Sequence, residues 1–518
     1  MAPKVLIVGA GPTGLVLALA LARRGIPFRI ISNASGPGEH SRAMGVHART
    51  LEFYQQFGFA DEVVARGVKM AGIHLRTGGH SGAGREVMQV SFADLGEGIS
   101  PFPFMLTFAQ DDHERFLLGE LNELGVDVEW NTELVGVSQD RQAATASISD
   151  GRGAPESTSF DYVCGCDGAR SRVRESLGVG FPGGSYEQLF FVADVEAEGD
   201  FDPDLYINLS ENILALMMPV RTSRMHRLIG IVPPDFPVTG DPQFEQIRNQ
   251  VEALLDIHVT RLNWFSTYHV HHRVAEHFRV GRAFLLGDAG HIHSPAGGQG
   301  MNTGIGDAIN LGWKLAQVLH DRAPEELLSS YEPERIAFAR RLVDTTDRAF
   351  RPLVAENVTG KLMRRIGVPL AVAIVSRVGM ARRAAFRTVS QVRIHYDDSP
   401  LSVGKTGHVR GGDRLPWAGS GEGEGGNFGP LTSLDWQVHV YGTAADEIRR
   451  FCQEARLPLH ILEFNAAAAR TGLARDATYL VRPDGYVAFV GTGACAAELR
   501  AFVDQQQLSF AGGGGPSE

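Results

Sequence analysis

The chain has 518 residues, of which 43% are hydrophobic and 21% charged, and this length and composition predict a globular protein with two or three domains. The formal net charge of −11 argues against non-specific nucleic-acid binding, which needs a basic surface. Four cysteines without a CxxC pair do not form a disulfide framework, and they favour a cytoplasmic location.

A short apolar strand and a glycine-rich turn open the chain. The expected elements are a strand, a helix and a second strand, at 4–8, 15–24 and 28–31. In the turn, Gly9 allows the tight bend, Gly11 leaves room for a pyrophosphate, and Gly14 lets the helix pack closely on the strand. This order predicts a dinucleotide-binding fold whose phosphates lie at the helix N-terminus. The cofactor contacts expected here are Gly9, Gly11, Pro12, Thr13 and Gly14.

The second strand departs from the usual dinucleotide motif at its end. An acid ordinarily stands there and hydrogen-bonds the ribose hydroxyls, but this chain has Ser32 and Asn33. Both side chains can hydrogen-bond without carrying charge. We therefore expect a weaker ribose contact at Ser32 and Asn33, or one that other residues supply.

The chain contains no segment that predicts a membrane span. The apolar stretch up to Ala22 resembles a signal peptide only loosely, because three glycines interrupt it. No other run of about 18 uncharged apolar residues occurs. The basic and apolar stretch at 361–387 could lie on a membrane as an amphipathic helix, but Pro369 interrupts it, and we interpret it as a helical connector.

A second glycine-rich segment follows an expected strand at 283–286. Gly287-Asp288 comes directly after that strand, and Gly297, Gly298 and Gly300 allow the backbone to approach a flat ring. The helix expected from Asn302 onward would present its N-terminus to this loop and stabilise negative charge on a ring bound there. His291 and His293 have no Glu or Cys arranged around them, so no metal site is predicted. An ordinary glycine-rich connector is the alternative interpretation.

The regions before and after this segment differ in pattern. Alternating apolar and polar residues at 188–270 predict an antiparallel sheet. A Gly/Pro-rich boundary at 411–429 precedes a strand, a helix, a hairpin and a final helix, expected at 436–441, 444–455, 478–490 and 496–506. This order is thioredoxin-like, and without CxxC the domain is expected to be structural or to bind a partner.

Four motifs in this order resemble a known family, the single-component FAD-dependent aromatic hydroxylases, which include para-hydroxybenzoate hydroxylase. They are Gly9–Gly14; Ser41-Arg42-Ala43 with Ala48-Arg49-Thr50-Leu51-Glu52; Cys164-Gly165-Cys166-Asp167-Gly168 with Arg170, Arg172 and Arg174; and Gly287-Asp288 through Asn302. The phenol-type and polyketide-tailoring members, which carry a thioredoxin-like domain, are closer in length. The resemblance implies an α/β fold with a Rossmann-like FAD-binding domain at 1–180 and 280–350. It also implies an inserted antiparallel-sheet substrate domain at 181–279, a helical connector at 351–400 and a thioredoxin-like domain at 401–518.

The resemblance also implies roles for individual residues. Asp167 would lie near the flavin pyrophosphate and the approaching nicotinamide, Asp288 would bind the ribityl chain or ribose, and Arg42 and Gln110 would hold the flavin. The residues expected beside the isoalloxazine ring are Pro295, Gly298, Gln299, Gly300, Met301 and Asn302. We expect Pro295 to be catalytic, together with His271, which could polarise or deprotonate a phenol from the middle sheet. A histidine at the surface or edge of that sheet is the alternative interpretation of His271.

The implied activity is that of a monooxygenase. NADH or NADPH would bind transiently, as in that family, because no separate Rossmann motif for the nicotinamide appears, and O2 would form a flavin hydroperoxide that attacks a phenolic or polycyclic aromatic substrate. Epoxidation or Baeyer–Villiger oxygenation of a natural product is an alternative, and so is a flavin-binding protein without turnover. The expected partners are small molecules, with no nucleic acid and no membrane. The sequence leaves a homodimer open.

Overall fold

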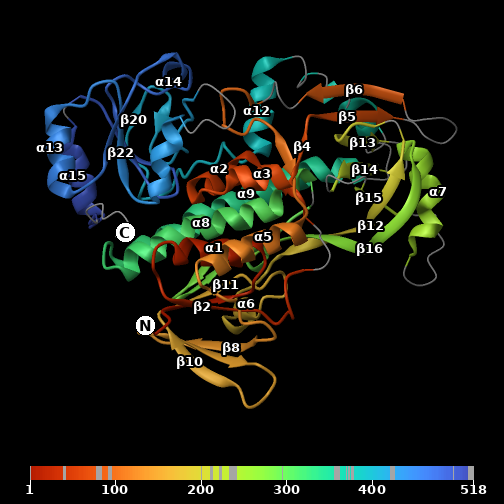
Figure 1. The fold of residues 1–518 in the computed structure, drawn as a ribbon, viewed down its shortest axis with the longest axis horizontal. Helices are drawn as coiled ribbons and strands as arrows, with labels where there is room; N and C mark the ends of the chain where they lie inside the picture. The colour runs from red at the N-terminus through yellow and green to blue at the C-terminus, as the bar shows by residue number, and fades with distance from the viewer. Residues whose placement is uncertain are drawn as a thin grey trace.

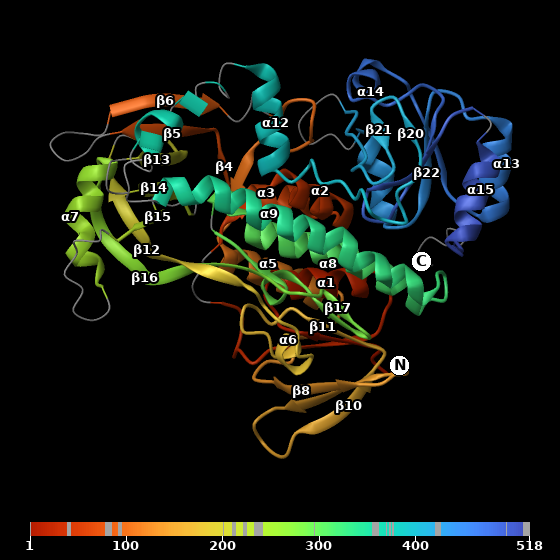
Figure 2. The same cartoon turned by 180° about the vertical axis from the view of Figure 1, so that it is seen from behind.

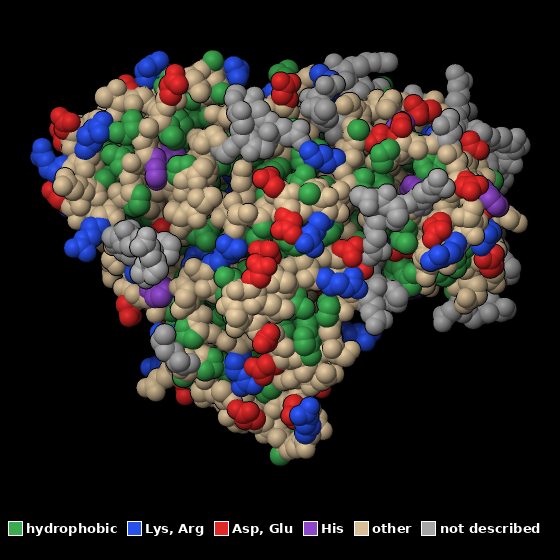
Figure 3. Space-filling model, viewed as in Figure 1, with side chains coloured by type: hydrophobic (Ala, Val, Ile, Leu, Met, Phe, Trp, Pro, Cys, Tyr) green, Lys and Arg blue, Asp and Glu red, His purple; other side chains and the backbone are tan. Residues whose placement is uncertain are grey.

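The computed structural model describes most of the chain, and its layers are visible in two opposite views (Figures 1 and 2). The described residues are 2–38, 43–77, 85–91, 96–199, 201–209, 214–220, 225–232, 242–294, 296–354, 362–368, 370–371, 374, 378–419, 426–493 and 495–510. Acidic and basic side chains are interspersed over the face seen in Figure 3.

A five-stranded sheet, in the order β17-β18-β11-β1-β2, forms the centre of the first large layer. Its strands are β1 (Val5–Val8), β2 (Phe28–Ile31), β11 (Tyr162–Gly165), β17 (Arg279–Val280) and β18 (Ala283–Leu285), parallel except for β17. Helices α1 (Pro12–Ala22), α5 (Gln110–Glu123) and α8 (Gln299–Leu319) lie on one face of this sheet. A smaller sheet lies toward the other face, made of β8 (Glu133–Gln139), β9 (Ala144–Ser149) and β10 (Glu156–Phe160). Because both faces are covered, all four residues of β1 are buried.

The glycine turn after β1 has the geometry that its sequence predicts. Gly9 has φ +105°, and a Cβ there would lie 2.3 Å from the Cys166 carbonyl oxygen. A Cβ on Gly14 would lie 1.9 Å from the Gly9 carbonyl oxygen, so only glycine lets α1 approach the turn. Helix α1 begins at Pro12, three residues before the expected start, because proline suits the first helical position.

The second large layer is an antiparallel-type sheet of eight strands, in the order β19-β16-β12-β15-β14-β13-β5-β6. The strands are β5 (Gly72–Thr77), β6 (Arg85–Ser91), β12 (Gly183–Glu198), β13 (Leu205–Leu209), β14 (Leu214–Pro219), β15 (Met225–Ile231), β16 (His258–Val274) and β19 (His291–Ile292). Only the pairing of β13 with β5 is parallel among these described pairs. Helix α7 (Phe244–Leu255) covers one face. The sequence predicts the central strands, but not that β5 and β6 join them from 72–91.

Short elements connect the two large layers. They are β3 (Gly45–Val46), β4 (Val68–Met70), β7 (Met105–Thr107), α2 (Ala48–Phe57), α3 (Ala60–Arg66), α6 (Arg172–Ser176), η1 (Gly287–Ala289) and η2 (Ala296–Gly298). After α8, the chain continues through η3 (Glu325–Ser330), α9 (Tyr331–Val354), a π-helical turn η4 (Met363–Gly367) and α12 (Gly379–Val389). Helices α8 and α9 run side by side in both views.

The C-terminal residues form a separate layer with a four-stranded sheet, in the order β23-β22-β24-β25. Its elements are β20 (Lys405–Thr406), β21 (Val409–Arg410), η5 (Gly426–Ser433), β22 (Gln437–Tyr441), α13 (Asp446–Ala455), β23 (Leu459–Leu462), α14 (Ala466–Arg470), β24 (Thr478–Val481), β25 (Val487–Gly491) and α15 (Ala496–Gln505). Strands β22 and β23 are parallel, and β24 and β25 form the expected hairpin. The overall α/β class is therefore the predicted one, whereas the domain boundaries stay a prediction.

Candidate functional site

A cavity of about 940 Å³ brings the two glycine-rich segments together. Gly11, Pro12 and Thr13 line it from the first segment. The second contributes Asp288 and the stretch 297–301, that is Gly297, Gly298, Gln299, Gly300 and Met301. A volume near the upper end of ordinary ligand pockets suits a large ligand or two adjacent ones. Segments almost 290 residues apart in sequence therefore share one site.

Two helix N-termini end at this cavity. Gly11 precedes α1 and Gly298 precedes α8, and neither helix has a side-chain cap. Their first N–H groups are thus left for a ligand, and the helix dipole favours negative charge there. A Cβ on Gly11 would meet no atom within 4 Å, so the glycine leaves an open place beside the backbone. The site fits a dinucleotide, with phosphates at α1 and a ring at α8.

Asn302 fixes the loop that precedes α8. Its Oδ1 accepts hydrogen bonds from His47 N (2.9 Å) and Thr50 Oγ1 (2.7 Å). Its Nδ2 donates to Gly45 O (2.8 Å) and Gly298 O (2.9 Å). The side chain is buried and does not line the cavity. Asn302 therefore holds the glycine segment against β3 and α2.

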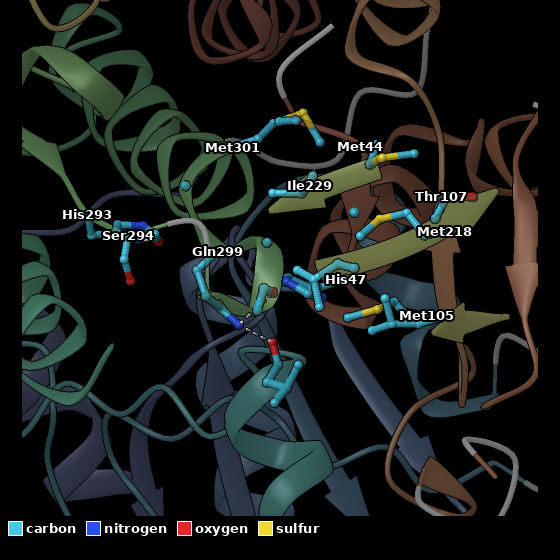
Figure 4. A pocket seen from close by; sticks show the side chains of 18 of the residues that line it. Met44, His47, Met105, Thr107, Met218, Ile229, His293, Ser294, Gln299 and Met301 are labelled. Carbon is cyan, nitrogen blue, oxygen red and sulfur yellow. Dashed lines mark hydrogen bonds between the residues drawn. The ribbon is translucent and has the colours of Figure 1, made fainter. Parts of the chain in front are cut away.

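The other expected cofactor residues divide into two groups. Gln110 lines the cavity, and its Oε1 accepts a hydrogen bond from Ala43 N (3.2 Å). Gln299 lines it too, but its Nε2 donates to Val389 O of α12 (2.8 Å), and Figure 4 shows this amide turned toward that helix. Gly9, Gly14, Ser32, Asn33 and Asp167 are not among the described lining residues.

Asp167 lies one residue from the cavity lining and caps a helix. Its Oδ2 accepts hydrogen bonds from the backbone N–H groups of Arg172 (2.7 Å) and Val173 (3.1 Å), at the start of α6. Its Oδ1 is buried without a partner, and burial raises the pKa of this carboxyl group. Cys166 and Gly168 on either side do line the cavity.

The residues expected to be catalytic are not found in the described cavity lining. His271 is exposed on β16, where its Nδ1 lies 2.5 Å from Ser185 Oγ. Pro295 lies outside the described residues, and so does Arg42. This exposure agrees with the surface interpretation of His271, and its catalytic role stays a prediction.

Two other histidines line the cavity instead. Nε2 is buried without a partner in both His47 and His293. Burial lowers the pKa of each ring to about 4, against the opposing effect of hydrogen bonds to nearby backbone groups. His293 Nδ1 lies 2.8 Å from Ser294 O, which can only accept, so Nε2 is the unprotonated nitrogen. The sequence gives no signal for His47, since a single histidine before a helix is common.

The opposite wall of the cavity is apolar and rich in methionine. It consists of Met44, Met70, Met105, Met218, Ile73, Leu75, Val90, Phe104, Phe190, Leu205, Ile207, Leu216 and Ile229. In Figure 4, Met105 and Met218 lie on the far side of His47 from His293. Thioether sulfurs make favourable contacts with aromatic rings and adapt to their shape. This wall suits a flat, apolar aromatic molecule.

Helix α12 and the turn before it close the cavity on a further side. Val368, Ala385, Phe386 and Val389 line it from there. Phe386 is buried, and a Cβ on Gly96 would lie 2.6 Å from its ring, so the two segments are in close contact. The expected connector thus takes part in the site.

Charge is scarce among the lining residues that the structure describes. Asp288 is the single Asp, Glu, Lys or Arg in that set. The described residues also contain no cluster of His, Cys, Asp and Glu arranged to hold a metal ion. No helix within the described ranges is long and apolar enough to cross a membrane.

Comparison with known proteins identifies close relatives. A family model described as an FAD binding domain matches residues 2–346. The chain is 35% identical over 415 residues to 6-methylpretetramide 4-monooxygenase of Streptomyces rimosus, covering 78% of this chain and 71% of that protein. It is 33% identical over 494 residues to a flavin-dependent monooxygenase of Mycobacteroides abscessus, covering 93% of this chain and 96% of that protein. The structure of OxyS anhydrotetracycline hydroxylase from Streptomyces rimosus is similar with a TM-score of 0.75 and 26% identity, over 97% of this chain and 98% of that one.

Proposed function

We propose that this chain, which belongs to the FAD-binding family of flavoprotein monooxygenases, hydroxylates an uncharged, polycyclic phenol. The chain is an FAD-dependent enzyme of the aromatic hydroxylase type, and reduced nicotinamide is the usual reductant of such enzymes. When bound, FAD would supply the redox chemistry, that is hydride acceptance and the activation of O2. Oxygen as co-substrate belongs to the proposal.

The observation that carries the proposal is the composition of the cavity. One wall is glycine backbone with two helix N-termini, and the other is a broad apolar surface of methionine and aliphatic side chains. No described Lys or Arg side chain lines the space, so the described lining offers no cationic partner for a substrate carboxylate. Two of the three relatives named above are a 6-methylpretetramide monooxygenase and an anhydrotetracycline hydroxylase, and both of these substrates are polycyclic.

The chain's own residues would bind, orient and shield the reactants. The backbone at Gly11 and at 297–300 would hold the pyrophosphate and ring of FAD, with Thr13, Gln110 and Asp288 as further contacts. The apolar wall would exclude water from the reacting atoms. The unprotonated Nε2 of His293 would accept a hydrogen bond from a substrate hydroxyl, and the unpaired Nε2 of His47 would form a second hydrogen bond with the substrate. With a pKa of about 4, these rings orient the phenol rather than remove its proton.

A substrate panel tests this proposal. It contains single-ring phenols, uncharged polycyclic phenols and aromatic carboxylates of both sizes, and each is assayed with NADH and NADPH. We expect kcat/KM to be at least about tenfold higher for the polycyclic phenols than for the other classes, with O2 consumed and hydroxylated product formed. A preference for carboxylates or for single rings would refute the substrate class. An epoxide or ester product would identify the other oxygenation chemistry. The homodimer and the cytoplasmic location stay predictions.

A further inference from the structure

The turn between β24 and β25 has no part in the proposed chemistry, yet its charged side chains are buried. Arg482 and Asp484, in the sequence Arg482-Pro483-Asp484-Gly485, are 0% and 1% exposed. The turn lies against the FAD-binding part of the chain: Trp313 Nε1 of α8 donates to Asp484 Oδ2 (3.0 Å), and Arg49 of α2 donates to Asp484 O (2.8 Å). Burial of charge is costly unless partners compensate it, so these two side chains need partners at the contact.

Four side chains form a compensated charge cluster at this junction. Arg482 donates to both carboxylate oxygens of Glu334, at 2.8 and 3.0 Å, and also to Asp484, at 3.0 and 2.6 Å. Lys314 Nζ of α8 donates to Glu334 Oε2 (2.8 Å). Two positive and two negative groups therefore balance. Burial raises the pKa of Glu334, but Arg482 and Lys314 outweigh this effect and hold it well below its ordinary value, so the carboxylate stays ionised.

Arg335, which follows Glu334 in α9, contacts the start of α8 directly and Gly287 through Asp307, so it is linked to both segments expected to hold the cofactor. Arg335 Nε donates to Asp307 Oδ1 (2.6 Å), and Arg335 NH2 donates to Thr303 O (3.1 Å) in the first turns of α8. Asp307 Oδ2 in turn accepts hydrogen bonds from Gly287 N (3.0 Å) and His291 Nε2 (2.8 Å). Arg335, Asp307 and His291 are all buried.

These two sets of contacts are continuous through α9. Glu334 binds the C-terminal turn, and its neighbour Arg335 binds the residue that holds Gly287. Gly287 directly precedes Asp288, which lines the cavity, and Thr303 follows the glycine segment 297–300. Because a close-packed interior transmits small displacements, a shift of α9 would change the spacing of both cofactor segments.

We propose that Arg482 is a positioning residue for the FAD site, through which the C-terminal domain sets the spacing of the Gly287-Asp288 segment and the start of α8. Arg482 does not touch the cavity and acts through Glu334, Arg335 and Asp307. This role goes beyond the proposed hydroxylation and is independent of the substrate's identity. It gives the thioredoxin-like domain a function that needs no cysteine pair.

The test measures FAD binding to the full chain without substrate. Flavin is removed from wild type, Arg482→Gln, Arg482→Lys and the control Val440→Ala, and FAD is titrated back while its fluorescence and visible spectrum are followed. Val440 is buried in a core cluster that joins the C-terminal sheet to Trp313 of α8, and it makes none of the hydrogen bonds above, so its truncation weakens packing there without removing the charge contacts. Thermal melting of the flavin-free proteins reports stability separately.

We expect Arg482→Gln to raise the Kd for FAD at least fivefold and to alter the flavin spectrum. Arg482→Lys should lie between Gln and wild type, because lysine keeps the charge but not the two-pronged contact. Val440→Ala should lower the melting temperature and leave the Kd within twofold. If Arg482→Gln does not fold, the Kd for FAD and the flavin spectrum of Arg482→Lys test the proposal in its place. An unchanged Kd and spectrum in the folded Arg482 variants, or an equal loss in Val440→Ala, would overturn the proposal.

Discussion

At the scale of single residues, Gly11 tests the cofactor site most cleanly. Its φ of −74° and ψ of −179° suit any amino acid, and a Cβ there meets no atom within 4 Å. Gly11→Val should therefore leave the fold intact while its side chain occupies the place expected for the pyrophosphate. We expect the Kd for FAD to rise about 100-fold, equivalent to ~2.7 kcal/mol, with the melting temperature of the flavin-free protein nearly unchanged.

Gly119→Ala is the matched control for that change. Gly119 lies on α5, has equally open surroundings and does not line the cavity. This control should retain FAD affinity and gain up to about 1 kcal/mol of stability. If Gly11→Val binds FAD as wild type does, the pyrophosphate lies elsewhere.

His47 carries the second prediction at this scale. His47→Leu removes the free Nε2 in the cavity and should lower kcat/KM about tenfold, or ~1.4 kcal/mol, while FAD content is retained. His271→Asn, on the exposed side of β16, should stay within twofold of wild type. Substrate-stimulated oxidation of the nicotinamide measures both. A tenfold loss of kcat/KM in His271→Asn with little change in His47→Leu would support the catalytic role expected for His271.

The sequence predicts residues whose role follows from the local backbone. Gly9 and Gly14 have the close contacts that their spacing indicates, and Asp288 lines the cavity. The sequence does not predict that His47 lines the cavity, because this follows only from the packing of β3 against the glycine segment 297–300. The motif of Asp167 does not reveal that its Oδ2 caps α6, and the cofactor contact of this residue stays a prediction.

At the scale of elements, the strands and helices with strong local patterns were predictable. The strands β1, β2 and β22 lie where the apolar runs place them, and α8 begins three residues before Asn302. Strand β23 was not expected, because a four-residue segment after Pro458 gives no clear period. Strands β5 and β6 were not predicted either, since their pairing with β13 joins residues far apart in sequence.

Asn302 tests how α8 is anchored. Asn302→Ala removes four hydrogen bonds and leaves the buried N–H of His47 and the buried hydroxyl of Thr50 without this acceptor, so we expect a loss of about 2–4 kcal/mol and weaker FAD binding. Urea denaturation and FAD titration measure the two effects. Asn465→Ala, which removes the cap of α14, should cost about 1 kcal/mol and leave FAD affinity unchanged. Wild-type FAD affinity in Asn302→Ala would mean that the loop holds its shape without this anchor.

At the scale of the whole molecule, buried histidines predict the response of stability to pH. Burial lowers the pKa of His113 and of His439 from 6.5 to about 3, and that of His47 to about 4. The unfolded chain therefore binds more protons than the folded one below pH 6.5. The contribution of these neutral histidines to the free energy of unfolding is fully present above pH 6.5 and is lost as the pH falls toward 4.

Each such histidine should lower the free energy of unfolding by about 2 kcal/mol at pH 5 relative to pH 7.5. Denaturation of the flavin-free protein at several pH values measures this loss. His439→Gln should make the profile flatter, whereas His408→Gln, at an exposed position, should not. A stability that is constant between pH 7.5 and pH 5 would contradict the buried, neutral state of these rings.

The cavity belongs to the whole molecule rather than to one segment. Its walls come from the glycine turns, the eight-stranded sheet and α12, which span residues 11–390. The sequence predicts the two glycine segments as one site, but the apolar wall depends on which strand faces point inward. That choice is set by tertiary packing and not by local pattern.

Incorporation of labelled oxygen tests the central claim most directly. The enzyme is supplied with reduced nicotinamide, ¹⁸O2 and the best phenol of the substrate panel, and the product is analysed by mass spectrometry. We predict one ¹⁸O atom in each hydroxylated product molecule, formed in step with nicotinamide oxidation. Product without ¹⁸O, or nicotinamide oxidation that yields hydrogen peroxide alone with every phenol tested, would contradict a monooxygenase acting in this cavity.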